Sequence, residues 1–210
     1  IRPEAVTVCN NALREYPHVI RFQVQYARAL ISTGRSREAV EAISPAADAG
    51  YPSAQTSLGE MHAAGQLDAR GKADLETAAT WFNLAGAQDH PPALVHIASL
   101  QASGKGGYAR SDDAAASTLR TAAEAGHPPA QTLLGQRFSS GKGVTRSYEN
   151  AGNWFTPAAN AGYADAQFLL AELYERGRGV TKDKAEAARW FEKARDNGHP
   201  DAAARLRRLQ

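Results

Sequence analysis

Apolar residues along positions 164–198 recur with the spacing of two successive helices. They appear every three or four residues before and after the turn RGRGV at 176–180, so each run forms a stripe on one helix face. The first stripe is Ala166, Leu170, Leu173 and Tyr174, and the second is Val180, Ala187, Trp190, Phe191 and Ala194. The pattern predicts two amphipathic helices joined by a short turn that contains glycine.

This helix pair is repeated along the chain. The string ARWFEKARDNGHPDA at 188–202 matches GNWFTPAANAGYADA at 152–166, and the tryptophans that align stand 36 residues apart. Related strings occur upstream at 116–130, 79–93 and 40–54, with extra residues that belong in loops. Such a period is typical of helical repeat proteins, in which each unit packs only against its neighbours. We therefore expect about a dozen helices and no single central core.

Each second helix has a recognisable start and stop. A residue able to accept a hydrogen bond from the first turn stands at the start, at Asp74, Ser111, Ser147 and Asp183. A glycine able to adopt the left-handed conformation follows the end, at Gly50, Gly126, Gly162 and Gly198. In the second unit Asp89 takes the place of this glycine and tolerates that conformation less well.

Small and aromatic residues at fixed positions predict how the helices pair. A small residue follows the Leu or Ile of each first helix and allows the next helix to approach closely, at Gly59, Ala98, Gly135 and Ala171. We expect three tryptophans to cover the junctions between units, namely Trp81, Trp154 and Trp190. A ligand-binding aromatic cage is the alternative, but the regular spacing favours packing.

Residues 164–199 resemble the Sel-1-like repeat, a branch of the tetratricopeptide superfamily. The resemblance lies in the A-x-x-x-L-G-x-x-Y, G-x-G-V-x-x-D and A-x-x-W-F-x-x-A segments. It implies an all-α fold, a right-handed superhelical solenoid of antiparallel helix pairs. The implied domains are tetratricopeptide-like helices at 1–51 (a half unit at 4–16 and a unit at 19–49), four Sel-1-like repeats at 52–199 and a capping helix at 200–210.

The repeat at 91–127 departs most from this pattern. Thr118 replaces the tryptophan, Gln101 replaces the tyrosine, and GKGGYARSDD replaces the G-x-G-V-x-x-D segment. We expect the loosest packing at this junction. The GKG strings at 104–106 and 141–143 lack the ending and the preceding strand of a phosphate-binding loop, so we interpret them as turns.

The resemblance also implies a role in protein interaction. Members of the family are typically adaptors that assemble signalling or envelope complexes, many of them bacterial. First helices line the concave groove of such a superhelix, where a peptide or partner protein would contact their non-core positions. The candidates there include Arg28, Glu60, His96, Ser99, Gln136, Phe168 and Glu172. Phe168 suits a binding anchor or packing beneath the next unit, and the alternative for the polar candidates is a solvated face.

We expect no catalytic, cofactor or metal site in this sequence. His90, His127 and His199 share one repeat position with two tyrosines, which indicates a common role at the junctions. His62 and His96 have no third ligand at a suitable spacing for a metal. An alternative function is that of a recognition or regulatory arm of a larger bacterial enzyme, with the catalytic domain outside this sequence.

The composition of the chain further limits the classes of partner that we expect. The 24 basic and 22 acidic residues leave a formal charge of +2, without a dense basic stripe that would favour nucleic acid. No apolar run is long enough for membrane insertion, and the single cysteine, Cys9, excludes an internal disulfide framework. The start lacks both a signal peptide and an initiating Met, which suggests a processed chain or a fragment. Cytoplasmic and bacterial periplasmic locations, and any oligomeric state, therefore stay open.

Overall fold

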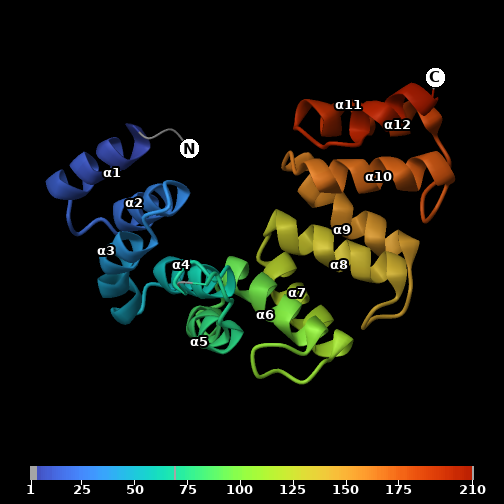
Figure 1. Ribbon diagram of the computed structural model, residues 1–210. Coiled ribbons are helices and arrows are strands. Elements are labelled where there is room, and N and C mark those ends of the chain that lie inside the picture. Colours follow the sequence, from blue (N-terminus) through green and yellow to red (C-terminus); the bar gives the residue numbers. More distant parts are fainter. Residues whose placement is uncertain (1–3, 69, 210) are drawn as a thin grey trace. The chain divides into compact units, whose positions relative to one another are not determined.

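The computed structural model describes residues 4–68 and 70–209, which form twelve α-helices and no strand. The chain divides into two compact units, unit 1 (Ile1–Arg110) and unit 2 (Ser111–Gln210), each a stack of helices (Figure 1). The boundary between the units falls within the repeat at 91–127. The all-α solenoid class expected from the sequence is confirmed.

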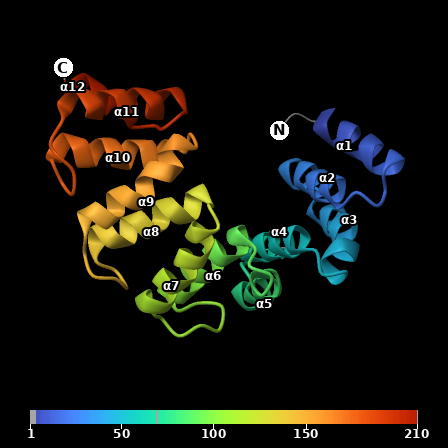
Figure 2. The ribbon, with the colours of Figure 1, turned by 180° about the vertical axis from the view of Figure 1, so that it is seen from behind.

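Successive helices pack side by side within each unit, as Figures 1 and 2 show from opposite directions. In unit 1 the first helices of the pairs are α2, α4 and α6; in unit 2 they are α8, α10 and α12. The helices of unit 1 are α1 (Glu4–Glu15), α2 (Ile20–Ser32), α3 (Ser36–Asp48), α4 (Pro52–Ala63), α5 (Leu75–Gly86) and α6 (Pro91–Ser103). Those of unit 2 are α7 (Asp112–Glu124), α8 (Pro128–Ser140), α9 (Tyr148–Asn160), α10 (Ala164–Arg176), α11 (Lys184–Asp196) and α12 (Ala202–Leu209).

The predicted caps of four second helices are confirmed. The side chains of Asp74, Ser111 and Ser147 each accept a hydrogen bond from the backbone N–H three residues later, at 3.0–3.1 Å. Asp183 accepts two, from the N–H groups of Ala185 and Glu186. These bonds satisfy amides that have no partner within the helix, so they determine where α5, α7, α9 and α11 begin.

The predicted stops are confirmed as well. Gly50, Gly126, Gly162 and Gly198 all have φ between 81° and 90°. Asp89 stands at the same position of the repeat at 52–90 and has φ of 54°. It is the one non-glycine residue with positive φ in the described parts of the chain. The left-handed stop is therefore imposed by the fold even where the sequence does not supply glycine.

In the pairs α4–α5 and α8–α9 a phenylalanine on the second helix lies directly against a glycine on the first. A Cβ atom added to Gly59 would lie 2.5 Å from the Cε1 atom of Phe82, and one added to Gly135 would lie 2.4 Å from Cε1 of Phe155. Phe82 and Phe155 are at most 1% exposed. The small residues are thus required where the rings cross the first helices, as the sequence predicted.

The phenylalanines lie deeper than the tryptophans that precede them. Trp190 is buried and the Lys193 ammonium lies 3.9 Å from the centroid of its ring, but Trp81 and Trp154 are only partly buried. The tryptophans therefore cover the outside of the contact, and the centre of each junction is the phenylalanine next to them.

In three of the repeats a buried glutamine links the first helix to the second helix that precedes it. The side-chain amides of Gln55, Gln131 and Gln167 donate hydrogen bonds to the carbonyl groups of Ala47, Ala123 and Ala159, at 2.9–3.2 Å. These carbonyls lie near the ends of second helices and also accept a hydrogen bond from the N–H of the glycine that follows, at Gly50, Gly126 and Gly162, so the glutamine is a second donor to each. In the repeat at 91–127 Leu94 stands at this position, so that repeat lacks the link.

The contact between Gly135 and Phe155 leads to a stability prediction. Gly135→Ala should lower the free energy of unfolding by roughly 1–3 kcal/mol, because the new methyl group must displace the buried ring. Gly152→Ala is the matched control in the next helix, since its Cβ would have its nearest contact at 3.5 Å, on Leu173. This control should be neutral or stabilising by up to about 1 kcal/mol, owing to the better helix propensity of alanine. Urea denaturation measures both, and an equal effect of the two substitutions would contradict the packing account.

Candidate functional site

Five of the predicted candidates occupy one position of the repeat. Each directly follows the small residue of a first helix, and the set consists of Arg28, Glu60, Ser99, Gln136 and Glu172. A second position, three residues before the first, is held by His96 in α6 and by Arg205 in α12. We call the surface formed by these two positions the first-helix face and describe it separately in each unit.

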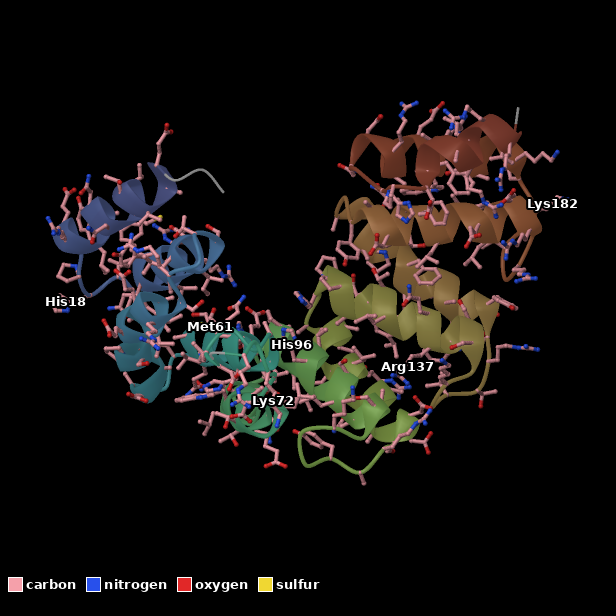
Figure 3. The ribbon with its side chains drawn as sticks, in the orientation of Figure 1. His18, Met61, Lys72, His96, Arg137 and Lys182 are labelled. Carbon is pink, nitrogen blue, oxygen red and sulfur yellow. The ribbon has the colours of Figure 1, made fainter. Side chains whose placement is uncertain are left out.

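In unit 1 the first-helix face contains a hydrogen-bonded pair of side chains on neighbouring first helices. The Nε2 atom of His96 on α6 lies 3.1 Å from the Oε1 atom of Glu60 on α4, and Figure 3 labels His96 in this region. The His96 ring stacks on the buried Phe82 ring with centroids 4.5 Å apart and an interplanar angle of 8°. The core therefore holds the histidine in the orientation that reaches Glu60.

The electrostatics of Glu60 follow from this geometry. The hydrogen bond from His96 is the main cause that lowers the pKa of Glu60, and the positive charge of Arg28 on α2 lowers it further. Three of the predicted candidates, on three successive first helices, thus act on one another. Ser99 is exposed on the same helix as His96, and its side chain forms no hydrogen bond within residues 4–68 and 70–209.

Unit 2 repeats the arrangement with arginine in place of histidine. Arg205 on α12 donates a hydrogen bond of 2.9 Å to Glu172 on α10, and its Nη2 atom also lies 3.0 Å from the Glu175 carboxylate without donating to it. Arg176 donates a second hydrogen bond of 2.9 Å to Glu172. Because Glu172 and Arg205 occupy the same positions as Glu60 and His96, each unit has a glutamate bonded to a side chain of the following first helix.

Next to this ion pair the face of unit 2 is uncharged. Gln136 on α8 is exposed and makes no side-chain hydrogen bond in the described part of the chain. At the position equivalent to His96 and Arg205, α8 has Leu133, which is 36% exposed, and α10 has the partly buried Leu169. The face of unit 2 thus combines apolar, amide and charged groups.

Phe168 packs beneath the next repeat, which was one of the two roles expected for it. Its ring stacks on His199 with centroids 4.0 Å apart, and it meets the ring of Phe191 edge-on at 5.2 Å. The ring is half-buried in the core of unit 2 and is used by the junction to the next repeat. The other candidates have their polar groups on the surface, whereas Phe168 supports the surface from below.

The structure also contains clefts that sequence reasoning did not identify, and two of them lie at turns that join the helices of a pair in unit 1. In unit 1 a cleft of about 660 Å³ is bordered by residues of the α4–α5 loop and by Lys105, and one of about 430 Å³ adjoins it at Leu67 and Asp68. In unit 2 a smaller cleft of about 210 Å³ includes Glu172 and Arg178. The available signal was the length of the repeat at 52–90, whose additional residues enlarge the α4–α5 loop.

Three further histidines have structural surroundings rather than a shared site. His199 stacks on Phe168, burial lowers the pKa of His127, and His62 lies 3.8 Å from Asp74. Within residues 4–68 and 70–209 no three His, Cys, Asp or Glu residues come together as metal ligands. The helices in the same ranges are all too short or too polar to cross a bilayer.

The GKG strings are turns, as the sequence indicated. The second glycine of each has positive φ, and a Cβ there would lie 2.6 Å from the carbonyl oxygen of Leu75 for Gly106 and 2.0 Å from that of Asp112 for Gly143. These glycines allow the turn to lie directly on the start of the preceding second helix.

Comparison with known proteins relates this geometry to a family. A sequence model described as Sel1 repeat matches residues 52–90, 128–163 and 164–199, more than half of the chain, and omits the divergent repeat at 91–127. A Sel1 repeat protein from Oxalobacter formigenes is 29% identical with a TM-score of 0.76, covering 98% of this chain and 59% of that one.

A second structure has the same fold. The protective antigen c5321 of uropathogenic Escherichia coli, described as displaying an SLR fold, is 23% identical with a TM-score of 0.76, covering 100% of this chain and 44% of that one. The chain thus spans 59% and 44% of the lengths of these two proteins. No curated protein matches it.

The hydrogen bond between His96 and Glu60 leads to a prediction about titration. His96→Phe should raise the pKa of Glu60, because a phenyl ring can still stack on Phe82 but cannot donate the hydrogen bond. Arg28→Ala should raise it less, since that charge is a smaller cause. Because the folded state has the lower pKa, Glu60 stabilises the fold at neutral pH, and this contribution is lost as the pH falls through the folded-state pKa. Carboxyl ¹³C NMR titration measures the shift, and an unchanged pKa in His96→Phe would contradict the pairing.

Proposed function

Because the chain belongs to the Sel1 repeat family, whose members generally serve as protein-interaction scaffolds, we propose that it is an adaptor that binds a peptide or partner protein along its first-helix faces. The ligand lies across successive first helices and contacts the two repeat positions described above. On the face of unit 1 the contacts are Arg28, Glu60, His96 and Ser99; on the face of unit 2, taken separately, they are Gln136, Glu172, Leu133 and Arg205.

The observation that carries this proposal is the contact between equivalent positions on neighbouring first helices. The pairs Glu60–His96 and Glu172–Arg205 bridge α4 to α6 and α10 to α12 at 3.1 and 2.9 Å. Side chains at these positions are therefore close enough for one extended ligand to contact several of them, which is how helical repeats bind peptides. The stacked His96 and the doubly bonded Glu172 are held in place before a ligand arrives, which reduces the entropy cost of binding.

Ser99 and Gln136 mark the positions where this surface is available to a ligand. Both are exposed, and within the described residues neither side chain has a hydrogen-bond partner. The alternative, a recognition arm of a larger enzyme, would use the same faces, so one experiment addresses both.

Site-specific photo-crosslinking tests the proposal. The photoreactive amino acid p-benzoylphenylalanine is placed at position 99 or 136 and, as the matched control, at Ser117, an exposed serine on the second helix α7. We expect one or a few discrete protein adducts from cell extract at positions 99 and 136, at least about tenfold more abundant than at 117, because hot-spot contacts are confined to the binding face. Ser99→Arg and Gln136→Arg should abolish recovery of the same proteins, while Ser117→Arg should not. Equal adducts at all three positions, or adducts at 117 alone, would exclude the first-helix faces as the binding site.

A further inference from the structure

A small cleft in unit 2 adjoins the first-helix face and has the size of a pocket for one side chain. It measures about 210 Å³ and is lined by residues of α8, α9 and α10 and of the turn that follows α10. Leu169 and Glu172, which occupy the two positions of the first-helix face, form part of its wall. Sites for small molecules usually measure about 300–1,000 Å³, so this cleft is better matched to a single side chain. We refer to it as the α8–α10 cleft.

The floor of the α8–α10 cleft is apolar. Phe155 is 1% exposed and Leu173 is 5% exposed, and the partly buried Leu169 packs against the same core. On the α8 side, the hydroxyl groups of Ser139 and Ser140 donate hydrogen bonds to backbone carbonyls of their own helix. An apolar side chain that covers these serines therefore leaves neither hydroxyl proton unpaired.

The rim of the cleft has an excess of positive charge. Its lining includes two arginines, Arg176 and Arg178, and one carboxylate, that of Glu172. Glu172 accepts hydrogen bonds of 2.9 Å from Arg176 and from Arg205, and Arg205 also lies 3.0 Å from the carboxylate of Glu175. Three arginines thus surround two carboxylates, and Arg178 is the one that has no carboxylate partner within residues 4–68 and 70–209.

Arg178 is held at the rim by Tyr148. Its guanidinium lies 5.2 Å from the centroid of the Tyr148 ring and donates a 3.4 Å hydrogen bond to the Tyr148 hydroxyl. A Cβ added to Gly179 would lie 2.3 Å from the carbonyl carbon of Tyr148, so the turn after α10 lies directly on the start of α9. A guanidinium has five N–H donors in a rigid plane, so this one contact leaves donors for a carboxylate.

The turns that flank the cleft add further positive charge. The α8–α9 turn connects Ser140 to Tyr148, both of which line the cleft, and the α10–α11 turn contains Arg178. Together these turns carry four cations and one carboxylate, namely Lys142, Arg146, Arg178, Lys182 and Asp183. All five are exposed, and Figure 3 labels Lys182. Glu149, in the first turn of α9, adds a second carboxylate, and positive charge still predominates.

The cleft of about 660 Å³ in unit 1 has the opposite balance. Its lining contains three carboxylates, those of Asp68, Asp74 and Glu76, against Lys72 and Lys105. An anionic ligand therefore gains no net attraction there, which makes these two lysines suitable control positions.

We propose that the α8–α10 cleft binds an acidic peptide segment of a partner protein, with one large apolar side chain against Phe155 and Leu169 and a neighbouring carboxylate on Arg178. The proposal rests on the proposed function, since the cleft shares its wall with the first-helix face of unit 2, and it specifies the ligand class of that face. Side chains next to the anchor of an extended peptide point away from the floor, toward the cations of the turns. The apolar floor favours a peptide over a nucleic acid, whose phosphate backbone would contact the cations alone.

The test uses the full chain and a blocked, dye-labelled heptapeptide that has one central leucine and glutamate at every other position. Fluorescence anisotropy should detect binding to the native chain, and Arg178→Gln with Lys182→Gln should weaken it at least about tenfold, because charge-assisted contacts are lost. Lys72→Gln with Lys105→Gln changes the net charge equally, on unit 1, and should change the affinity less than about twofold. Circular dichroism verifies that both double variants are folded.

Measurements on the native chain make the test independent of the variants. The peptide with serine in place of leucine, and the peptide with glutamine in place of glutamate, should each bind at least about tenfold more weakly, since each lacks one of the two contributions. The methyl NMR signals of Leu169 and Leu173 should shift when the original peptide is added. Absence of binding, equal loss in both double variants, or shifts confined to other residues would overturn the proposal. Tighter binding of a single-stranded oligonucleotide that is lost in Arg178→Gln with Lys182→Gln would overturn the assignment of a peptide as the ligand.

The results also separate this proposal from the proposed function. Discrete crosslinked adducts at position 136 without any binding of the acidic peptide would overturn the ligand class and leave the first-helix face as a binding surface. Binding of the peptide with shifts at Leu169 and Leu173, but without adducts at positions 99 and 136, would support the cleft and overturn the larger face.

Discussion

The rest of the structure depends on the close packing of paired helices, which is tightest where a phenylalanine ring of the second helix crosses a glycine of the first. At Gly59 and Gly135 the ring lies where a Cβ atom would be, so the two helices approach more closely than any larger residue permits. The buried ring fixes the rotation of the first helix about its own axis. That rotation decides which side chains face the core and which lie on the first-helix face, and so it places Glu60 beside His96 and Glu172 beside Arg205.

Much of this arrangement could be predicted from the sequence because its causes are local or periodic. The caps at Asp74 and Asp183 act within one helical turn, and the stop at Asp89 is forced by its repeat position. The link through Gln167 could not be predicted, since a glutamine in an amphipathic pattern gives no sign that it will be buried against the carbonyl of Ala159. Whether Trp154 or Phe155 lies deeper likewise depends on the path of the neighbouring helix.

The candidate surfaces, too, could be predicted from the sequence only in part. The repeat position shared by Glu60 and Glu172 was evident from the alignment of units, but their partners were not, because His96 and Arg205 come from the following first helix and are different residue types. The cleft of about 660 Å³ beside the α4–α5 loop has no periodic signal in the sequence. It arises from backbone contacts within one enlarged loop, such as the approach of Gly65 to Gly71, and these follow from no spacing of apolar residues. A regular scaffold and one irregular loop thus provide two kinds of surface.

The most direct measurement of the central packing claim is a double-mutant cycle on Gly135 and Phe155. Gly135→Ala, Phe155→Leu and the combination are compared with the native chain by urea denaturation. If the methyl group and the ring compete for the same space, the shorter leucine relieves the clash. The double variant is then less destabilised than the sum of the single variants, by about 1 kcal/mol or more. Additive effects within about 0.5 kcal/mol would mean that the two residues do not share this space, which would contradict the account.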